Sequence, residues 1–310
     1  MISIIIPVLN EEKSIAQLKQ EIDVVFKKQL TDSYEILFVN DGSIDNSQKE
    51  IEAVVRKDPQ HVKYIEFRTN FGKAAALRAG FEAAKGTIIV QMDGDLQDRP
   101  DQLPHLIKKL HEGYELVVGW KQHRQDSFIK NTTSQFFNWV TNLISRVHLH
   151  DHNCGLKAYK AQVAKELLLY GELHRYIAVV ASAKGYRIAE VPIEHRKRQS
   201  GASKYGISRF INGFLDLLTV IFITKFKSRP LHFFGYIGLL CFFFGLLIAI
   251  YLTAIKFIGS QSIGDRPLLL FSVMLMIMGV QIGVTGIVGE QIATMMHRDR
   301  GDYVIKKSSL

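Results

Sequence analysis

The sequence predicts an α/β domain, with a mostly parallel sheet and helices on both faces, followed by an interfacial amphipathic helix and two transmembrane helices. The first observation behind this prediction is the alternation of short, continuously apolar runs with amphipathic segments, which is typical of a buried parallel sheet. The second is a pair of uncharged stretches, 232–255 and 267–289, each longer than the ~20 apolar residues that cross a bilayer. Buried helices of a large globular core are usually shorter and carry charges along one edge, so we favour two spans.

Five apolar runs are the expected strands, in chain order 2–7, 35–39, 62–67, 87–92 and 116–119. The segments between them have the spacing of amphipathic helices. In segment 12–29 one face carries Ile15, Leu18, Ile22, Val25 and Phe26. This alternation of strands and helices predicts parallel pairing throughout the first part of the chain.

Polar motifs follow four of these strands directly. They are Asn10-Glu11, Asp41-Gly42-Ser43, Arg68-Thr69-Asn70 and Asp93-Gly94-Asp95. Because ligands of open parallel sheets bind at the carboxyl ends of the strands, we expect these motifs to converge on one binding site.

Beyond Arg196 the chain changes character. Residues 196–206, RKRQSGASKYG, are basic and rich in small side chains, and we expect them to form a loop. Apolar residues at helical spacing through 207–222 then predict a helix that lies on a membrane surface. The alternative is an ordinary helix packed on the preceding domain.

The net charge of +9 is concentrated near 196–204, 225–229 and the C-terminal tail. A basic surface beside membrane helices indicates anionic lipid head groups or phosphates, and the basic residues lack the aromatic neighbours expected of a nucleic-acid binder. The positive-inside rule places both termini and the soluble domain in the cytoplasm, with two spans in the cell (inner) membrane. The chain begins with a strand pattern, so we expect no signal peptide, and its two cysteines, Cys154 and Cys241, are not expected to pair.

The segment QMDGDLQD, residues 91–98, carries the sharpest chemical signal. Asp93, Asp95 and Gln97 offer oxygen ligands from one turn, which suits Mg²⁺ or Mn²⁺ sharing its shell with substrate phosphates. An ordinary Asx-turn is the competing interpretation of the motif taken alone.

Several other kinds of site are disfavoured. The chain has neither a G-x-G-x-x-G after the first strand nor a Walker A motif, which argues against dinucleotide cofactors and P-loop nucleotides. His148, His150 and His152 alternate around Asp151, a poor arrangement for zinc ligands.

Four segments, PVLNEE, VNDGSIDNS, FRTNFGKAAALRAG and QMDGDLQD, resemble in order and spacing those of family 2 inverting glycosyltransferases with the GT-A fold. DHNCGLKAY at 151–159, GELHRYI at 171–177, RQSGASKYG at 198–206 and the two C-terminal spans extend the resemblance to the polyprenyl-phosphate glycosyltransferases, which include bacterial bactoprenol glucosyltransferases and dolichol-phosphate mannose synthase. The resemblance implies a GT-A catalytic domain at 1–202, a basic loop end and interfacial helix at 203–229, two transmembrane helices at 230–296 and a cytoplasmic basic tail at 297–310.

The resemblance also implies roles for individual residues. Nucleotide-sugar contacts fall on Pro7, Leu9, Glu11, Asp41, Asn70, Lys73 and Asp93, and metal or diphosphate contacts fall on Asp93, Asp95 and Gln97. Acceptor-phosphate contacts fall on Arg124, Lys130, Ser134, Arg198, Ser203 and Lys204. Asp95 and Asp151 are the implied catalytic residues, with Asp151 acting as a base or only orienting groups, and His174 and Arg175 brace the same pocket. A solvated surface lysine is the competing interpretation of Lys73, and a turn aspartate that of Asp151.

The implied reaction is the inverting transfer of one hexose, glucose from UDP-glucose in the first instance, to a polyprenyl phosphate such as undecaprenyl phosphate. GDP-mannose or UDP-GlcNAc as donor, a catalytically inactive nucleotide-binding membrane scaffold and a transporter subunit are the alternatives, and self-association into a homo-oligomer is left open. The chain lacks the Q-x-x-R-W motif of processive synthases and an obvious Glu-Asp pair for a base. An acceptor phosphate with a second pKa near 6 arrives already anionic, so it needs positioning more than a base.

Overall fold

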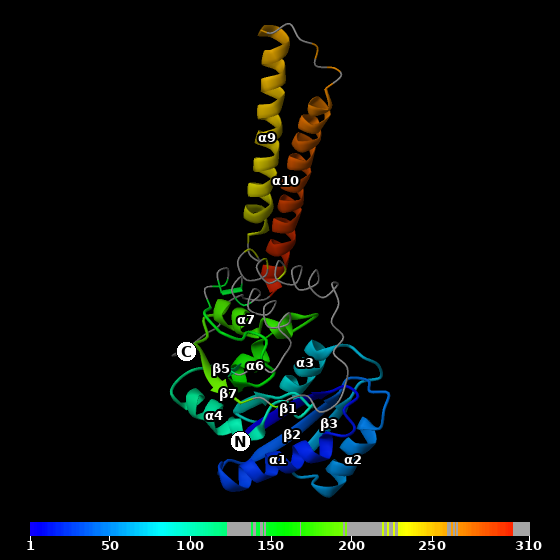
Figure 1. Cartoon of the computed structure of the whole chain (residues 1–310), viewed down its shortest axis with the longest axis vertical. Coiled ribbons are helices and arrows are strands. Elements are labelled where there is room, and N and C mark those ends of the chain that lie inside the picture. Colours follow the sequence, from blue (N-terminus) through cyan, green and yellow to red (C-terminus); the bar gives the residue numbers. More distant parts are fainter. Residues whose placement is uncertain are drawn as a thin grey trace. The chain divides into compact units, whose positions relative to one another are not determined.

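The structure is a computed structural model that describes residues 1–122, 138, 141–142, 145, 147–167, 169–194, 196, 219, 222, 226, 229–258, 262, 264 and 266–299. The chain divides into two compact units, Met1–Val220 and Ile221–Leu310. Figure 1 shows the first unit as a sheet with helices and the second as a helical hairpin.

A seven-stranded sheet forms the centre of the first unit, with strand order β3-β2-β1-β4-β6-β5-β7. The strands are β1 (Ile2–Val8), β2 (Tyr34–Asn40), β3 (Val62–Glu66), β4 (Ile88–Gln91), β5 (Leu116–Lys121), β6 (Lys157–Lys160) and β7 (Ile188–Ile193). Among these strands only β6 runs against its neighbours, since it pairs antiparallel with both β4 and β5 while the remaining pairs are parallel. The prediction of a mostly parallel α/β sheet is confirmed.

Helices cover this sheet on both faces. Ile4, Ile5 and Ile6 of β1 are all 0 % exposed, and successive side chains of a strand point to opposite faces. The helices and short 3-10 turns are α1 (Ile15–Lys28), α2 (Ser47–Lys57), α3 (Lys73–Ala83), η1 (Pro100–Gln102), α4 (Leu103–His111), α6 (Ala161–Glu166), η2 (Leu173–Arg175) and α7 (Ile177–Ala183). The buried face of α1 consists of the five apolar residues that its sequence spacing predicts.

The five predicted strands are all present, within one or two residues of their expected ends. Strands β6 and β7 were not predicted. Their sequences explain why, because β6 is the four residues KAYK with a lysine at each end, and β7 (IAEVPI) includes Glu190 and Pro192. Neither has the continuous apolar run by which a buried strand is recognised in a sequence.

The second unit consists of α9 (Pro230–Ile258) and α10 (Pro267–Asp299), which contain the two predicted spans. Both helices are long and apolar enough to cross a membrane, with mean hydropathies of 2.5 and 2.2, and few of their residues are buried. The predicted interfacial helix at 207–222 lies almost entirely outside the described residues.

Small residues spaced seven apart let the two helices of the hairpin touch. A Cβ added at Gly238 would lie 2.6 Å from the Gly279 carbonyl oxygen, and one added at Gly245 would lie 2.7 Å from the Ser272 carbonyl oxygen. Ser272 is 0 % exposed. Such close backbone approach is how helices associate in an apolar solvent, where van der Waals packing replaces the hydrophobic effect.

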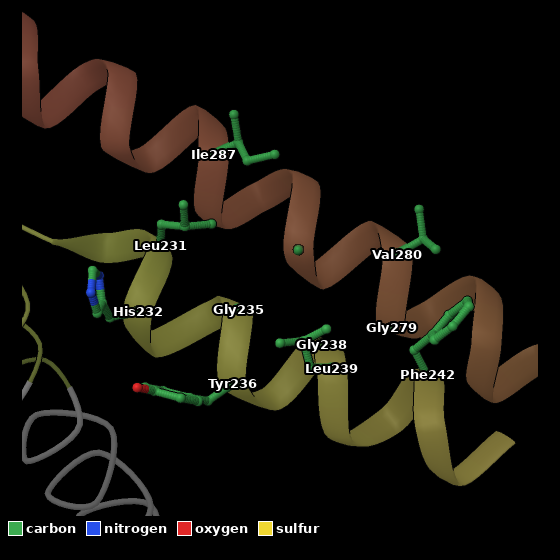
Figure 2. A pocket seen from close by; sticks show the side chains of 11 residues that line it. Leu231, His232, Gly235, Tyr236, Gly238, Leu239, Phe242, Gly279, Val280 and Ile287 are labelled. Atoms are coloured by element: carbon green, nitrogen blue, oxygen red, sulfur yellow. The ribbon is translucent and has the colours of Figure 1, made fainter. Parts of the chain in front are cut away.

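An apolar groove of about 490 Å³ lies along this contact, lined by both helices. Figure 2 shows Gly235, Gly238 and Gly279 along it, with His232 and Tyr236 near one end. The backbone N–H of Leu231 donates to Glu290 (3.1 Å), which ties the first turn of α9 to α10.

Candidate active site

Four chain segments meet at one edge of the sheet, beyond the carboxyl ends of the parallel strands. Asp41 follows β2, Asp93 follows β4 and Lys121 ends β5. Because β6 is antiparallel, its first residue, Lys157, lies at this edge as well, in register with Gln91 and Val118. The sequence predicts that the polar motifs after the parallel strands meet at this edge. In the structure, the segment that precedes β6 lies there as well.

The loop after β4 has a strained backbone. Leu96 is buried and has φ 61°, a conformation that is rare for a branched side chain and is concentrated at functional sites. The Gln97 N–H donates to Asp95 Oδ1 (3.1 Å), and the Asp93 N–H donates to Asp98 Oδ2 (3.4 Å). The loop therefore presents Asp93, Asp95 and Gln97 half-buried, while Asp98 lies fully inside.

Cations surround these carboxylates. Lys73, the first residue of α3, places its Nζ 2.5 Å from Asp93 Oδ1, and the Lys121 Nζ lies 3.4 Å from Asp98 Oδ1. Although burial opposes ionisation, the ammonium groups of Lys73, Lys121 and Lys157 lower the pKa of the Asp93 carboxyl to about 2. Asp93 is therefore a carboxylate throughout the physiological pH range.

The pKa values of two lysines at this site, half-buried Lys121 and buried Lys157, shift in opposite directions. Burial acts to lower the pKa of Lys121, but Asp98 and its other anionic neighbours outweigh burial and raise that pKa. Burial lowers the pKa of Lys157, which is 1 % exposed and donates to the Cys154 carbonyl. Lys121 thus remains charged, and Lys157 holds the loop that precedes its own strand.

Gly155 lets the segment before β6 pack directly against the Asp93 and Asp98 carboxylates. A Cβ at this position would lie 2.4 Å from Asp93 Oδ2 and 2.6 Å from Asp98 Oδ2. Only glycine allows the 151–157 segment to approach the loop after β4 this closely.

Asp151 is 1 % exposed and accepts a hydrogen bond from the Asn153 N–H at Oδ1 (3.2 Å), as in an Asx-turn. The backbone N–H groups of His150 and Asp151 donate to Glu190 of β7, and the His150 ring stacks on Trp120 at 4.0 Å. Asp151 also contributes to raising the pKa of Lys121, so it lies close to the same charge cluster. The turn role and the functional role predicted for Asp151 are compatible.

Asp41 organises the loop that leads to Lys73. It is 4 % exposed, and its carboxylate accepts hydrogen bonds from the N–H groups of Phe71 (2.7 Å) and Gly72 (3.0 Å). Burial raises the pKa of Asp41, while these two hydrogen bonds oppose the rise. The nucleotide-sugar contact that the resemblance implies for Asp41 would have to share a carboxylate that already holds this loop.

The remaining predicted nucleotide-binding residues lie near the ends of β1 and β3. Pro7 is in β1 and half-buried, and Leu9 is 43 % exposed. The Glu11 N–H donates to Ser47 Oγ (2.8 Å), which links this turn to the start of α2. Asn70 is exposed in the segment that precedes α3.

Buried His152 and half-buried His174 stay neutral at neutral pH. Burial, followed by Lys73 and Arg175, lowers the pKa of His174 to about 3. Burial lowers the pKa of His152 to about 4, and its Nε2 lies 2.7 Å from Asn142 Oδ1. His148 and His150, in contrast, are exposed.

The donor set of the loop after β4 fits a divalent cation that completes its coordination with substrate. Within the part of the chain that the structure describes, no three His, Cys, Asp or Glu side chains gather as a metal cage. Mg²⁺ and Mn²⁺ do not require one, since one or two carboxylates plus substrate phosphates suffice. Asp93, Asp95 and Gln97 supply oxygen ligands of that kind from one turn.

The six predicted acceptor-phosphate residues lie outside the described residues: Arg124, Lys130, Ser134, Arg198, Ser203 and Lys204. Their roles remain predictions.

The structure adds five residues that sequence reasoning did not single out. They are Asp98, Lys121, Gly155, Lys157 and Glu190. Asp98 belongs to QMDGDLQD, and Gly155 and Lys157 belong to DHNCGLKAY, so a closer reading of those two motifs would have found them. Lys121 and Glu190 belong to strand segments without a motif and become visible only through the strand pairing.

Comparison with known proteins extends over both units. Residues 3–168 match the family described as "Glycosyl transferase family 2", and residues 229–295 match the "GtrB C-terminal hairpin". The chain is 36% identical over 312 residues to the dodecaprenyl-phosphate galacturonate synthase of Rhizobium johnstonii, covering 99% of this chain and 92% of that one. It is 32% identical to the undecaprenyl-phosphate 4-deoxy-4-formamido-L-arabinose transferase of Proteus mirabilis, covering 99% and 93%.

Among solved structures, the glucosyl-3-phosphoglycerate synthase of Mycobacterium tuberculosis, crystallised with Mn²⁺, UDP and glucosyl-3-phosphoglycerate, is similar with a TM-score of 0.57. The match covers 72% of this chain and 79% of that one at 17% sequence identity, which shows a shared fold.

Proposed function

The chain belongs to glycosyl transferase family 2, and we propose that it transfers one sugar from a nucleotide sugar to a polyprenyl phosphate, giving a polyprenyl-phosphate sugar and a nucleoside diphosphate. The observation that carries the proposal is the closure of Gly155 against the carboxylates of the DGDLQD loop, at the edge of the sheet where nucleotide ligands bind. The acceptor class is supported by the relatives, which are named as polyprenyl-phosphate sugar transferases and align over nearly the whole chain.

The chemistry follows from the charges at the site. Asp93, Asp95 and Gln97 would hold Mg²⁺ or Mn²⁺ against the diphosphate, and the metal, when bound, supplies the positive charge that the departing diphosphate requires. Mn²⁺ and UDP in the fold neighbour support this cofactor and a uridine nucleotide. Lys73 and Lys121 balance Asp93 and Asp98, so the loop does not repel the incoming diphosphate.

The acceptor phosphate attacks the anomeric carbon from the side opposite the diphosphate, so the configuration inverts. Its second pKa near 6 makes it mostly dianionic at neutral pH, and the nucleophile needs no base. Asp151 then has an orienting role. This assignment agrees with its buried, hydrogen-bonded setting in the turn before β6.

Glucose is the transferred sugar expected from the sequence resemblance. A second candidate is galacturonic acid, favoured by the identity of 36% to a galacturonate synthase. Galacturonate differs from glucose by a carboxylate, for which an arginine or lysine side chain would be the expected partner.

We place the enzyme in the cell (inner) membrane, with the first unit and both termini in the cytoplasm. The two apolar helices and the match of residues 229–295 to a hairpin of the same family support a membrane location. The orientation rests on the positive-inside rule. The relatives bear on the membrane and lipid partners but not on a homo-oligomer, which the sequence left open.

The test is an assay of the purified full chain in detergent with undecaprenyl phosphate. UDP-glucose, UDP-galacturonate, UDP-GlcNAc, GDP-mannose and the UDP sugar of 4-deoxy-4-formamido-L-arabinose are compared by mass spectrometry of the lipid product. We expect one donor to give a polyprenyl-phosphate sugar, Asp95→Ala to give none, and EDTA to abolish the reaction. Binding of a nucleotide sugar without product from any donor would favour the inactive scaffold instead.

A further inference from the structure

One carboxylate in β7 holds the backbone on which Asp151 is mounted. Glu190 Oε1 accepts hydrogen bonds from the N–H groups of His150 and Asp151, both at 3.0 Å. Its Oε2 lies 3.1 Å from the His150 N–H and 2.7 Å from His150 Nδ1. The Glu190 side chain is 12 % exposed and the His150 side chain is 66 % exposed, so the bond to the Asp151 N–H is better shielded from water than the bonds to His150.

The rest of the environment holds the same short segment. The His150 ring stacks on Trp120 with the ring centroids 4.0 Å apart and the planes 16° from parallel. The preceding residue, Leu149, is held by Asn142. The Asn142 side chain donates to the Leu149 carbonyl (3.0 Å) and accepts from the Leu149 N–H at Oδ1 (3.2 Å). Glu190 is the charged member of this arrangement and the one that contacts the Asp151 backbone directly.

Strand pairing gives Glu190 a fixed position. It lies opposite Val118 in the parallel β5–β7 pair, and β5 ends at Trp120 and Lys121. A carboxylate mounted on a paired strand is a firmer reference point than one in a loop, because the sheet fixes its backbone. Asp151, by contrast, precedes β6 in a segment without secondary structure.

We propose that Glu190 is a positioning residue for the transfer reaction, which fixes the Asp151 carboxylate at the substrate by holding the His150 and Asp151 backbone. This inference rests on the proposed function, in which Asp151 orients the sugar or the acceptor phosphate. Glu190 itself touches neither substrate and acts only through the 150–151 backbone. It should therefore affect turnover without affecting the affinity for the donor.

Glu190→Gln tests this proposal with almost no change in side-chain size. In either orientation of the Gln amide, the NH₂ group replaces a carboxylate oxygen that faces the His150 N–H, and the negative charge that the His150 and Asp151 N–H groups face is lost. We expect kcat to fall by about 10- to 100-fold, the factor that corresponds to losing a hydrogen bond to a charged group. The donor KM should stay within about twofold, as expected for a group that is not part of uniform substrate binding.

Glu194→Gln is the matched control. Glu194 lies four positions further along the chain, its side chain is 72% exposed, and it pairs with Arg99 rather than with the 150–151 backbone. We expect wild-type kcat and KM from this control. Equal losses in Glu190→Gln and Glu194→Gln would show that any charge change in this region has the same effect, and would overturn the proposal.

A double-mutant cycle separates positioning from a general structural role. If Glu190 acts through Asp151, Glu190→Gln should cost little further activity in an Asp151→Asn background. If the two losses multiply, Glu190 acts independently of Asp151 and the proposal is wrong. Should Asp151→Asn retain no measurable transfer, the same cycle is run with Asp151→Glu, which keeps the carboxylate.

A structural readout distinguishes failure of this proposal from failure of the proposed function. In a Trp139→Phe background, Trp120 is the sole tryptophan and its emission reports the stack with His150. Glu190→Gln should change this emission and Glu194→Gln should not, whether or not the correct sugar has been found. Unchanged emission and full activity in Glu190→Gln and in the shorter Glu190→Asp would refute the positioning role. Absence of transfer by the wild-type chain, with the emission change present, would refute only the proposed function.

Discussion

At the scale of single residues, the site depends on how closely two segments approach each other. Gly155 lies so close to Asp93 and Asp98 that an added Cβ would overlap both carboxylates. Lys73 forms an ion pair with Asp93, and Lys121 forms one with Asp98. A substitution that adds volume at Gly155 should therefore displace the loop after β4.

Gly155→Ala adds the smallest possible volume. Its Cβ would lie 2.4 Å from Asp93 Oδ2, so the Asp93 carboxylate must move. We expect transfer to fall by about 100-fold and the chain to lose about 1–3 kcal/mol of stability, as for an overpacked core. Steady-state kinetics and thermal unfolding measure the two effects. Gly264→Ala, at a position with nothing within 4 Å, is the control and should change neither.

The buried histidines predict a loss of stability in acid. The pKa of His152 is lowered to about 4 from 6.5, so between these pH values the unfolded chain binds a proton that the folded chain does not. The stabilisation is therefore fully present above pH 6.5 and is lost as the pH falls towards 4, by up to about 1.4 kcal/mol per pH unit.

Thermal unfolding of His152→Gln across this pH window tests the assignment. The variant should show a flatter dependence of Tm on pH than the wild type, while His148→Gln, at an exposed position, should keep the wild-type slope. A wild-type slope in His152→Gln would mean that another group, such as His174, carries the acid sensitivity.

The sequence predicted some of the charged residues at the site and missed others. Asp93, Asp95 and Gln97 were found because they follow one apolar strand within a single motif. Lys121 and Glu190 could not be found in this way, because their roles depend on residues far away in the chain: Lys121 approaches Asp98, and Glu190 holds His150 and Asp151. No local pattern reports such pairings, which arise only when the strands are in register.

At the scale of secondary-structure elements, the contact between α9 and α10 depends on the seven-residue spacing of small side chains. Gly279 faces Gly238 across this contact, whereas Gly283, one turn later in the same helix, has nothing within 4 Å of an added Cβ. The two glycines therefore provide a matched pair within one helix.

Gly279→Ala should destabilise the hairpin and Gly283→Ala should not. The first substitution places a Cβ 2.6 Å from the Gly238 carbonyl oxygen, which we expect to cost about 1–3 kcal/mol. The second meets open space and gains helix propensity, so its effect should be neutral or stabilising by up to about 1 kcal/mol. Thermal unfolding of both variants in detergent measures the difference. Equal Tm values would contradict the close backbone contact.

The elements also show which parts of the fold a sequence reveals. Continuous apolar runs identified β1, β2, β4 and β5 because the side chains of those strands are mostly buried, whereas in β3 only Val62 is buried. Strand β6 escaped because two of its four residues are lysines, and one of those, Lys157, is buried at the start of the strand. A charged residue in the core is explained by its partners in the folded structure, which the sequence does not display.

At the scale of the whole molecule, the net charge of +9 accompanies two helices of membrane-spanning length. Anionic lipids attract basic segments by about 1 kcal/mol per residue near the surface, an attraction that salt screens. The proposed acceptor, a polyprenyl phosphate, is itself an anionic lipid, so we expect the same charges to attract it.

Reconstitution tests this attraction. With polyprenyl phosphate at a fixed surface density, transfer in vesicles containing 30% phosphatidylglycerol should show a steeper decline with salt than transfer in pure phosphatidylcholine. We expect an acceptor KM that rises about 3- to 10-fold between 50 mM and 500 mM salt, with the donor KM less affected. An acceptor KM independent of salt in both lipids would show that the basic surface does not contribute to acceptor capture.

The antiparallel course of β6 has a consequence for how such a protein can diversify. Because β6 is paired along both edges, Gly155 and Lys157 enter the site at a point set by β4 and β5. The same pairing holds Gly155 beside Asp93. Insertions and deletions should therefore be selected against in 91–98 and 151–157, because a shift of either segment would separate Gly155 from the carboxylates.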